Sequence, residues 1–469
     1  MPEKATLLTV YKFLPQTNCG ECGEVNCMSF ASLLLERKAV PEGCPPLKTA
    51  KYRPQLERLK ELIAPPIKEV LVGVGEKAVK LGGKEVMYRH ELMYHNPTAI
   101  AIDVSDTWDD DKIVERCKSV EAYEVQRIGQ KLRLDMVAIR YASGAPEKFA
   151  HAVSVASKST LLPLILCCLD SEVMRSALEQ KGVHDVKPLL YAATKDNWKD
   201  MGYLAKQYSC PIVAYAPSDM SGLKSLAATL RAIGVENIVL DPGTFLEGKQ
   251  LMDMTSNLTM LRRSAIQKGD KDVGYPIMGV SAIVWLTGED PTATSFKEAC
   301  LAANSVLRYT DLVVMHTMEP WALLPIVTLR QNVYTDPRKP VAIEAGLKAI
   351  GSPDENSPVL VTTNFALTYY TVLSDLETAG ITCHLIGIDT GGLAVECSVA
   401  GGQFNAALVR DTLASTKMEE KVKHRKLIIP GLAARLRGDL EDTTKWEILV
   451  GPRDSSQIND FLKKVWTSN

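Results

Sequence analysis

Short apolar runs recur along the chain from residue 69 to residue 317, and stretches with helical spacing separate them. Near-continuous apolar strands that alternate with helices are buried on both faces, and eight in succession are what a (β/α)8 barrel requires. We therefore predict a barrel, with a long open α/β sheet as the alternative. PIMGVSAIVWL could add a strand and change the count. The eight runs are EVLVGVG, AIAIDVS, LDMVAIRY, LLPLILCC, PLLYAAT, PIVAYA, NIVLDPG and DLVVMHT.

The same alternation resumes near the C-terminus, where VLVTTNF (359–365), TCHLIGID (382–389), KLIIPG and EILVGP read as strands between helices. This predicts a doubly wound α/β domain. Residues 319–340 carry four prolines and little periodicity, so they read as a linker. The expected α/β organisation is therefore 1–63 as a small cluster domain, 64–325 as the barrel and 326–469 as the last domain.

The first fifty residues contain four cysteines, with two, four and sixteen residues between successive members. Asn18, Gly20 and Gly23 tolerate the tight turns that three nearby thiolates need, and residues 28–38 read as a helix. An all-thiolate set with uneven spacing favours a 4Fe-4S cluster, with zinc as the main alternative and a disulfide framework as a weaker one. The four predicted metal ligands are Cys19, Cys22, Cys27 and Cys44.

Composition narrows the class of protein. The formal net charge is -2, with 54 basic and 56 acidic residues, so nothing indicates nucleic acid or an anionic membrane as a partner. The N-terminus does not resemble a signal peptide, and no apolar run approaches the roughly 20 residues that span a bilayer. We expect a cytoplasmic protein. The remaining seven cysteines are scattered and are predicted to be structural: Cys117, Cys167, Cys168, Cys210, Cys300, Cys383 and Cys397.

Two sets of strand ends carry polar residues. In the last domain, turns rich in Thr, Asn and Gly follow the predicted strands, and none matches a dinucleotide or phosphate-binding fingerprint. Together these turns can bind the amide and oxygen groups of a large flat ligand. A simpler interpretation of the Thr-Asn pair at the end of VLVTTNF is that it caps the following helix. At the barrel mouth the polar candidates mainly indicate ties between loops: Asp103, Ser105, Arg140, Asn237 and Asp241.

The four-cysteine segment, VTTNFALTYY (361–370), DTGGLAV (389–395), KLIIPG and LVGPRDSS together resemble the large subunit of the corrinoid iron-sulfur protein. This subunit is called gamma in the archaeal acetyl-CoA decarbonylase/synthase complex. The resemblance covers essentially the whole chain. It implies a cluster domain, a barrel and a cobalamin-type corrinoid domain, with corrinoid contacts at Thr362, Thr368, Gly392, Leu393, Ala394, Val395 and Ile458.

The resemblance also implies a reaction and partners. Co(I) of the corrinoid, and no amino acid, would act as the nucleophile that takes a methyl group from methyltetrahydrofolate or methyltetrahydrosarcinapterin. The methyl group would pass to acetyl-CoA synthase in the acetyl-CoA (Wood-Ljungdahl) pathway, in carbon fixation or methanogenesis, and the cluster would reduce Co(II). The chain would thus be a methyltransferase component. Its implied partners are a small subunit in a heterodimer, a methyl-tetrahydropterin methyltransferase, acetyl-CoA synthase/CO dehydrogenase and a low-potential electron donor.

One absent motif agrees with a base-off corrinoid. The sequence has no D-x-H-x-x-G motif, whose histidine binds the lower face of cobalt in many cobalamin proteins, and the last domain contains only His384 and His424. Two other functions stay open. The barrel itself could be a pterin-dependent methyltransferase, or the chain could be an electron-transfer scaffold with a cluster and no corrinoid.

Overall fold

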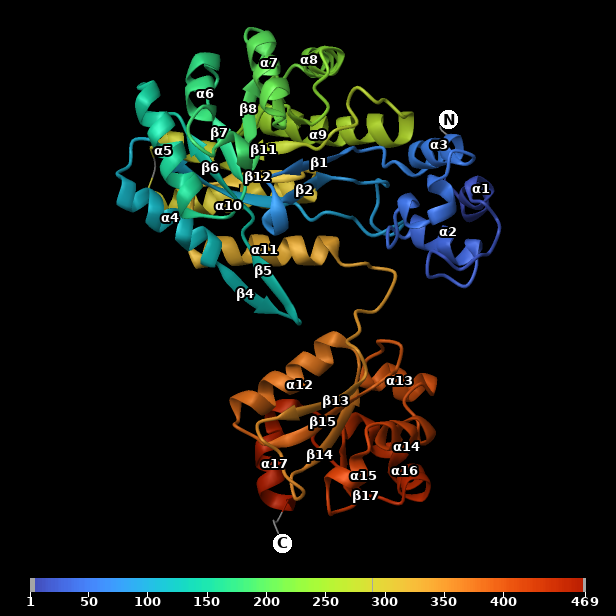
Figure 1. Ribbon diagram of the computed structural model, residues 1–469. Coiled ribbons are helices and arrows are strands. Elements are labelled where there is room, and N and C mark those ends of the chain that lie inside the picture. Colours follow the sequence, from blue (N-terminus) through green and yellow to red (C-terminus); the bar gives the residue numbers. More distant parts are fainter. Residues whose placement is uncertain (1–4, 289, 467–469) are drawn as a thin grey trace. The chain divides into compact units, whose positions relative to one another are not determined.

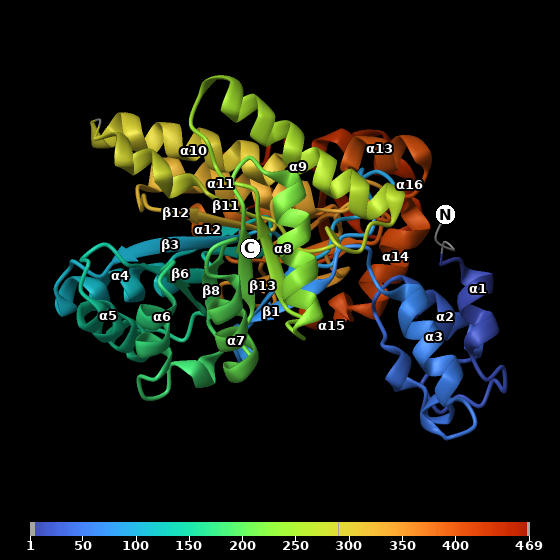
Figure 2. The same cartoon turned by 90° about the horizontal axis from the view of Figure 1, so that it is seen from above.

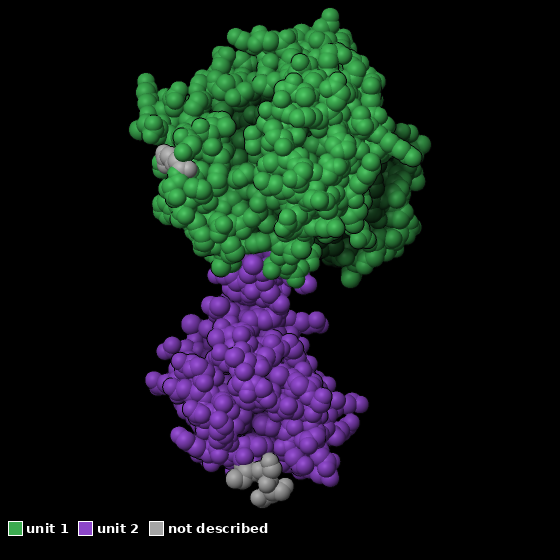
Figure 3. Space-filling view, turned by 90° about the vertical axis from the view of Figure 1, so that its left-hand side faces the viewer, with its two compact units in different colours: residues 1–124, 133–334 green, residues 125–132, 335–469 purple. Residues whose placement is uncertain are grey.

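The computed structural model describes residues 5–288 and 290–466. Contacts between Cα atoms divide the chain into two compact units, 1–124 with 133–334 and 125–132 with 335–469 (Figure 3). The short insertion in the second unit contains most of the hairpin formed by β4 (Glu124–Arg127) and β5 (Gln130–Arg133). The three-domain division 1–63, 64–325 and 326–469 stays a prediction.

The N-terminal segment is helical and holds its own small core. It consists of α1 (Leu7–Phe13), α2 (Cys27–Leu35) and α3 (Arg53–Ile63), with two 3-10 turns, Pro41–Gly43 and Pro45–Lys48, around Cys44. The predicted helix at 28–38 is therefore confirmed with shifted ends. Ten buried residues from all three helices and the turns form the core: Val10, Leu14, Cys27, Phe30, Ala31, Leu34, Cys44, Leu47, Leu56 and Leu59.

The central region forms the predicted barrel. Eight parallel strands follow the order β10-β9-β8-β7-β6-β3-β12-β11, and a parallel bridge between Leu240 and Ile277 closes the sheet. Three of the eight strands, β3, β10 and β12, are buried along their whole length, and each of the other five has a single half-buried residue, as in a barrel covered by helices. The strands are β3 (Ala99–Ser105), β6 (Met136–Arg140), β7 (Leu164–Cys167), β8 (Leu189–Ala193), β9 (Ile212–Tyr215), β10 (Ile238–Asp241), β11 (Met278–Val280) and β12 (Leu312–Met315).

Helices surround these strands (Figures 1 and 2). Several begin with an N-cap residue: the Asp109 carboxylate accepts the N–H of Lys112 at 2.8 Å, so Asp109, Asp110 and Asp111 form the start of a helix. The helices are α4 (Asp110–Ala122), α5 (Pro146–Ser159), α6 (Ser171–Leu178), α7 (Trp198–Tyr208), α8 (Met220–Ala232), α9 (Gly248–Lys268), α10 (Pro291–Leu307) and α11 (Pro320–Tyr334).

The first predicted barrel strand was wrong. EVLVGVG contains β1 (Glu69–Val72), which pairs antiparallel with β2 (Val79–Gly82) in a separate hairpin, and the missing barrel strand is β11 within PIMGVSAIVWL. The side chains of β1 alternate between exposed and buried, unlike those of a barrel strand. Val70, Val72 and Leu81 of the hairpin fill the barrel interior beside the first residues of its strands, so the hairpin closes the amino end.

The C-terminal unit is a five-stranded sheet in the order β13-β15-β14-β16-β17, parallel except for β13. Its strands are β13 (Gly346–Ile350), β14 (Val359–Thr363), β15 (Cys383–Ile388), β16 (Lys426–Ile429) and β17 (Glu447–Val450). The sequence analysis missed β13. Helices α12 (Ala366–Thr378) and α17 (Ile458–Val465) pack on one face, and α13 (Val395–Gly401), α14 (Ala406–Ser415) and α16 (Arg437–Thr444) pack on the other, while α15 spans Met418–Lys421. The doubly wound layout is confirmed.

Residues 319–340 are not a linker throughout. They contain α11, in which Leu323, Ile326 and Val327 are buried despite the internal Pro325. The Arg330 guanidinium ties this helix to the barrel, since it donates to the carbonyl oxygens of Thr98 at 3.1 Å and Arg133 at 2.5 Å. Among the described helices, none combines the length and apolarity of a membrane span.

Candidate functional site

The four cysteines of the N-terminal segment lie on one tight loop and one turn. Asn18, Gly20 and Gly23 all have positive φ, as predicted, and the Asn18 side chain accepts the N–H of Cys27 at 3.0 Å. That bond folds the loop back onto the start of α2. Cys27 is the first residue of α2, where helical N–H groups favour a thiolate.

Burial increases along the set. Cys19 is exposed and Cys22 is half-buried, whereas Cys27 and Cys44 are 7% and 4% exposed and belong to the core. Burial raises the pKa of the Cys44 thiol, and the nearby thiols of Cys22, Cys19 and Cys27 raise this pKa further. The other three thiols therefore lie near enough to Cys44 to disfavour its ionisation, which a bound cation would reverse.

A site for a single metal ion, such as zinc, would need at least three ligand side chains close together. Among residues 5–288 and 290–466, no three Cys, His, Asp or Glu side chains lie close enough together to hold one metal ion. The zinc alternative therefore has no preformed ligand set there. In a 4Fe-4S cluster each cysteine binds a different iron atom, so the thiolates lie farther apart than around one ion.

The second candidate site is the carboxyl edge of the C-terminal sheet, and Asn364 organises it. Its side-chain oxygen accepts the N–H groups of Thr390 and Gly392, each at 3.0 Å, and the Thr390 hydroxyl at 3.1 Å. Its amide group donates to the Asp389 carboxylate at 3.0 Å and to the Ile343 carbonyl at 3.4 Å. One buried side chain thus fixes the turn after β15. The sequence analysis placed Asn364 in a turn without recognising this role.

Residues 340–344, here called the strap, cross the same edge. Ile343 donates its N–H to the carbonyl of Asn364 at 2.9 Å, and Ala366 donates to the carbonyl of Val341 at 2.8 Å. The strap also covers Gly392, whose φ is +77°. A Cβ atom there would lie 2.9 Å from Cβ of Pro340. Local sequence signals could not reveal this packing, because the partners are more than twenty residues apart.

The predicted corrinoid contacts have different surroundings. Thr362 is the second-last residue of β14, on the face of α12 and α17, and is 2% exposed, while Thr368 lies in the first turn of α12. The residues from Gly392 to Val395 connect β15 to α13. Ile458, at the start of α17, packs into the core beneath α12. Thr362, Thr368 and the Gly392 turn therefore share the carboxyl edge, while their binding roles stay predictions.

Both histidines of this unit lie away from that edge. His384 is the second residue of β15, and His424 precedes β16, where its Nε2 lies 3.0 Å from the Ser357 carbonyl. From His384 to Ile388 a strand advances about 13 Å. A ligand at the carboxyl edge is thus out of reach of either imidazole.

At the barrel mouth, some of the polar residues predicted there contact one another and one of them lies elsewhere. Arg140 Nε donates to Asp103 Oδ2 at 3.1 Å, and Nδ1 of His316 pairs with the same carboxylate. The Tyr191 hydroxyl donates to Asp241 at 2.9 Å. Asn237 was wrongly placed here, because it precedes β10 and lies at the opposite, amino end of the barrel.

Comparison with known proteins places the chain in a family. The model for the CO dehydrogenase/acetyl-CoA synthase delta subunit matches residues 69–462, and a model described as a putative Fe-S cluster matches residues 14–46. The gamma 2 subunit of the acetyl-CoA decarbonylase/synthase complex of Methanosarcina thermophila is 48% identical over 98% of both chains. The chain belongs to this gamma-subunit family. The Archaeoglobus fulgidus gamma subunit is 49% identical, again over 98% of both chains.

Solved structures give a weaker likeness. Dihydropteroate synthases from Xanthomonas albilineans and Thermus thermophilus match with TM-scores of 0.37 and 0.38 and 17% identity. They cover 51% and 56% of this chain and 95% and 100% of theirs. This likeness is too low to carry an argument about ligands.

The residues at both sites fit the cofactors of a corrinoid iron-sulfur protein. The Fe-S match includes all four cysteines of the first segment, which supply only thiol ligands. At the second site the buried hydroxyls of Thr362 and Thr363 have no hydrogen-bond partner among the described residues. A buried hydroxyl without a partner is costly, so the Thr362 oxygen, which belongs to a predicted contact residue, is suited to a ligand.

Proposed function

We propose that this gamma-family chain is a methyl carrier that holds a corrinoid at the carboxyl edge of its C-terminal sheet and a 4Fe-4S cluster on Cys19, Cys22, Cys27 and Cys44. When bound, the corrinoid supplies a cobalt nucleophile for methyl transfer, and the cluster supplies the low-potential electron that restores it after oxidation. The methyl donor is a methyl-tetrahydropterin and the acceptor is acetyl-CoA synthase. A small subunit, a methyltransferase and an electron donor are the further partners.

The residues of the chain bind and orient the two proposed cofactors. The turn held by Asn364 presents the backbone from Gly392 to Val395, and Thr362 and Thr368 offer hydroxyls from β14 and α12. In the N-terminal segment, the exposed Cys19 lies where a redox partner can approach, and the buried Cys27 and Cys44 shield the inner side.

The observation that carries the proposal is the chemistry of the C-terminal carboxyl edge. It brings the hydroxyls of Thr362 and Thr368 and the turn from Gly392 to Val395 together, and both His384 and His424 lie at the amino edge. A cobalt atom at this edge would have no histidine from this unit below it. A corrinoid held by these residues would supply a reduced cobalt as the nucleophile.

The test separates methyl transfer from reactivation. The reconstituted chain, with its small subunit and a methyl-tetrahydropterin methyltransferase, is incubated with substrate that carries a radioactive methyl group. Cys22→Ser should accept label after strong chemical reduction but should not recover after oxidation when only the protein electron donor is present. Cys300→Ser, an exposed cysteine in α10, is the control and should behave like the parent. Absence of label on the parent, or full recovery by Cys22→Ser, would contradict the proposal.

A further inference from the structure

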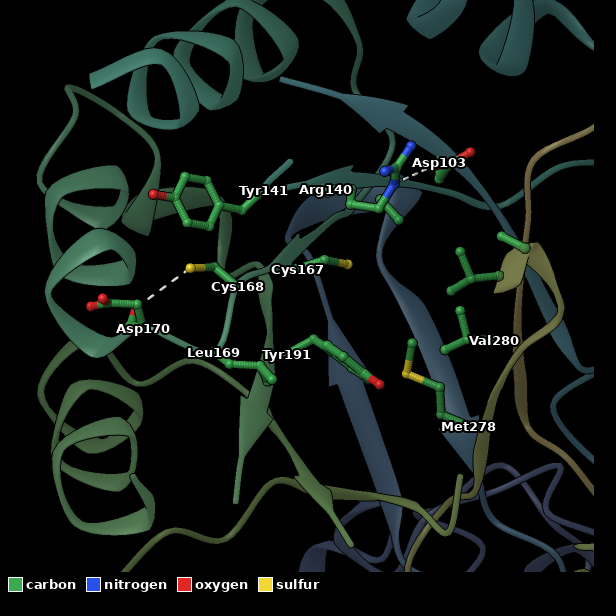
Figure 4. A pocket seen from close by; sticks show the side chains of 13 residues that line it. Asp103, Arg140, Tyr141, Cys167, Cys168, Leu169, Asp170, Tyr191, Met278 and Val280 are labelled. Carbon is green, nitrogen blue, oxygen red and sulfur yellow. Dashed lines mark hydrogen bonds and ion pairs between the residues drawn. The ribbon is translucent and has the colours of Figure 1, made fainter. Parts of the chain in front are cut away.

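A cavity of about 460 Å³ opens at the carboxyl ends of the barrel strands (Figure 4). Its size falls within the range of small-molecule sites, and its position is the face where barrel proteins bind ligands. The proposed methyl-carrier function uses neither this cavity nor its lining, so its chemistry needs a separate account.

The cavity exists because large side chains fill only one end of the barrel. The hairpin β1–β2 inserts Val70, Val72 and Leu81 at the amino end. Toward the mouth, small residues such as Ala138 and Ala282 face the interior and leave space.

The inner wall is apolar and carries no free charge. Met278, Val280 and Val314 line it with Cys167 and Tyr191. Burial raises the pKa of the Cys167 thiol and of the Tyr191 phenol, so both stay neutral. The phenol is also occupied, since it donates to Asp241, whose own pKa burial raises to about 6. A charged group has no counterion on this wall.

Unlike the inner wall, the rim of the cavity carries a positive charge, the guanidinium of Arg140. Its Nε donates to Asp103 Oδ2 at 3.1 Å, and Asp103, 4% exposed, is shared with Nδ1 of His316. The Arg140 side chain is 43% exposed, and its two Nη groups have no hydrogen-bond partner within the described residues. Asp103 therefore fixes the guanidinium and leaves its terminal fork available. Such a fork matches a carboxylate with two parallel hydrogen bonds.

We propose that the barrel mouth is a second binding site, for a small organic carboxylate whose apolar, aromatic-sized body fills the cavity while its carboxylate pairs with Arg140. All residues that line this site belong to the barrel region. A neutral analogue of the same shape would keep the apolar contacts but lose the charge-assisted hydrogen bonds.

The test is calorimetric titration of the full-length protein with 2-naphthoate and with the uncharged 2-naphthamide. We expect one site per chain and at least about tenfold tighter binding of the carboxylate, the size of a charge-assisted pair. Arg140→Leu should reduce 2-naphthoate affinity to that of the amide. Arg140→Lys, which keeps the charge without the fork, should fall between them.

A second variant tests the cavity rather than the charge. Val280→Trp fills the space and should abolish binding of both compounds, while iron content and methyl acceptance stay at the parent level. Equal affinities for carboxylate and amide in the parent, no binding at millimolar concentration, or binding that survives both Arg140→Leu and Val280→Trp would each overturn the proposal. These outcomes leave the methyl-carrier proposal untouched, since that proposal is measured by methyl acceptance.

Discussion

The cluster segment and the C-terminal sheet are both small units with a proposed cofactor, but they are stabilised in different ways. The segment has one core of ten buried residues, and two of these, Cys27 and Cys44, are proposed metal ligands. The C-terminal unit has seventeen buried residues on one face of its sheet and ten on the other. In the first region the proposed cluster would be part of the core, and in the second the proposed corrinoid would lie outside it.

This difference has a thermodynamic consequence. A segment of about 60 residues with a small core is marginal by itself, so metal binding and folding are coupled. A doubly wound sheet buries enough apolar surface to fold without its ligand, and binding then adds stability only by mass action. The contrast predicts that loss of the cluster unfolds its segment, whereas loss of the corrinoid leaves its unit folded.

Loss of a buried ligand should produce the largest effect. In Cys44→Ser, amide protection of residues 14–46 should fall at least about 100-fold, because the cluster and the core are lost together. Protection of β14 and β15 should not change. Hydrogen exchange of the full-length protein measures both regions at once, and Cys397→Ser, an exposed cysteine, is the control. If residues 14–46 stayed protected in Cys44→Ser, the segment would fold without its cluster, and the predicted difference from the C-terminal unit would not exist.

Asn364→Leu should cause the next largest loss of stability. The substitution keeps the volume and leaves the buried N–H groups of Thr390 and Gly392 without acceptors, which we expect to destabilise the C-terminal unit by about 2 to 5 kcal/mol. Asn405→Leu removes two exposed hydrogen bonds, the cap bond from the Leu408 N–H and the one donated to the Gly402 carbonyl, and should cost about 1 kcal/mol. Hydrogen exchange of β15 gives both values. Equal costs would mean that Asn364 does not organise the turn.

The two glycines of the turn form a matched pair. Gly391 and Gly392 both have positive φ, so alanine at either should cost about 1 kcal/mol of backbone strain. A Cβ at 391 meets nothing within 4 Å, while one at 392 lies 2.9 Å from Pro340 and 3.1 Å from Ala342. We expect Gly392→Ala to cost a further 1 to 3 kcal/mol or so and to expose the strap to exchange. Identical exchange in both variants would show that the strap is not packed on the turn.

The smallest effect on stability should come from Thr362→Val. Its hydroxyl is buried without a partner, so its removal should leave the free energy of unfolding unchanged or raise it by up to about 1 kcal/mol. Corrinoid affinity should nevertheless fall several-fold. Thr363→Val removes a second such hydroxyl on the opposite face of β14 and should not weaken corrinoid binding. An absorbance titration with cobalamin measures both affinities. Equal cobalamin affinities of the two variants would contradict the predicted role of Thr362.

Strand positions were largely predictable, because parallel strands buried on both faces leave continuous apolar runs. The exceptions have physical reasons. EVLVGVG looked like such a run, but Leu71 is 49% exposed and the strand forms a hairpin. β11 is only three residues long and contains Gly279, so its pattern was weak. Prolines concealed α11, because tertiary packing offsets the disruption that Pro325 causes.

For the sites, spacing and turn chemistry were informative, and long-range contacts were not. Cysteine spacing indicated the first candidate site, and the alignment of parallel strand ends indicated the second. The hydrogen bonds from Asn364 to Gly392 and to Ile343 join residues far apart in sequence, so no local pattern encodes them. Ile458 was predicted as a contact only because the family resemblance implies it; its side chain packs in the core, and its binding role stays a prediction.

The central claim is that one chain holds both a 4Fe-4S cluster and a corrinoid without a histidine ligand. Iron and cobalt analysis together with EPR spectra of the anaerobically purified protein and its small subunit tests this most directly. The account predicts about four irons and one cobalt per chain, and a Co(II) signal without nitrogen splitting from an axial imidazole. Four irons with no cobalt, even after reconstitution with cobalamin, or a nitrogen-split signal, would contradict it.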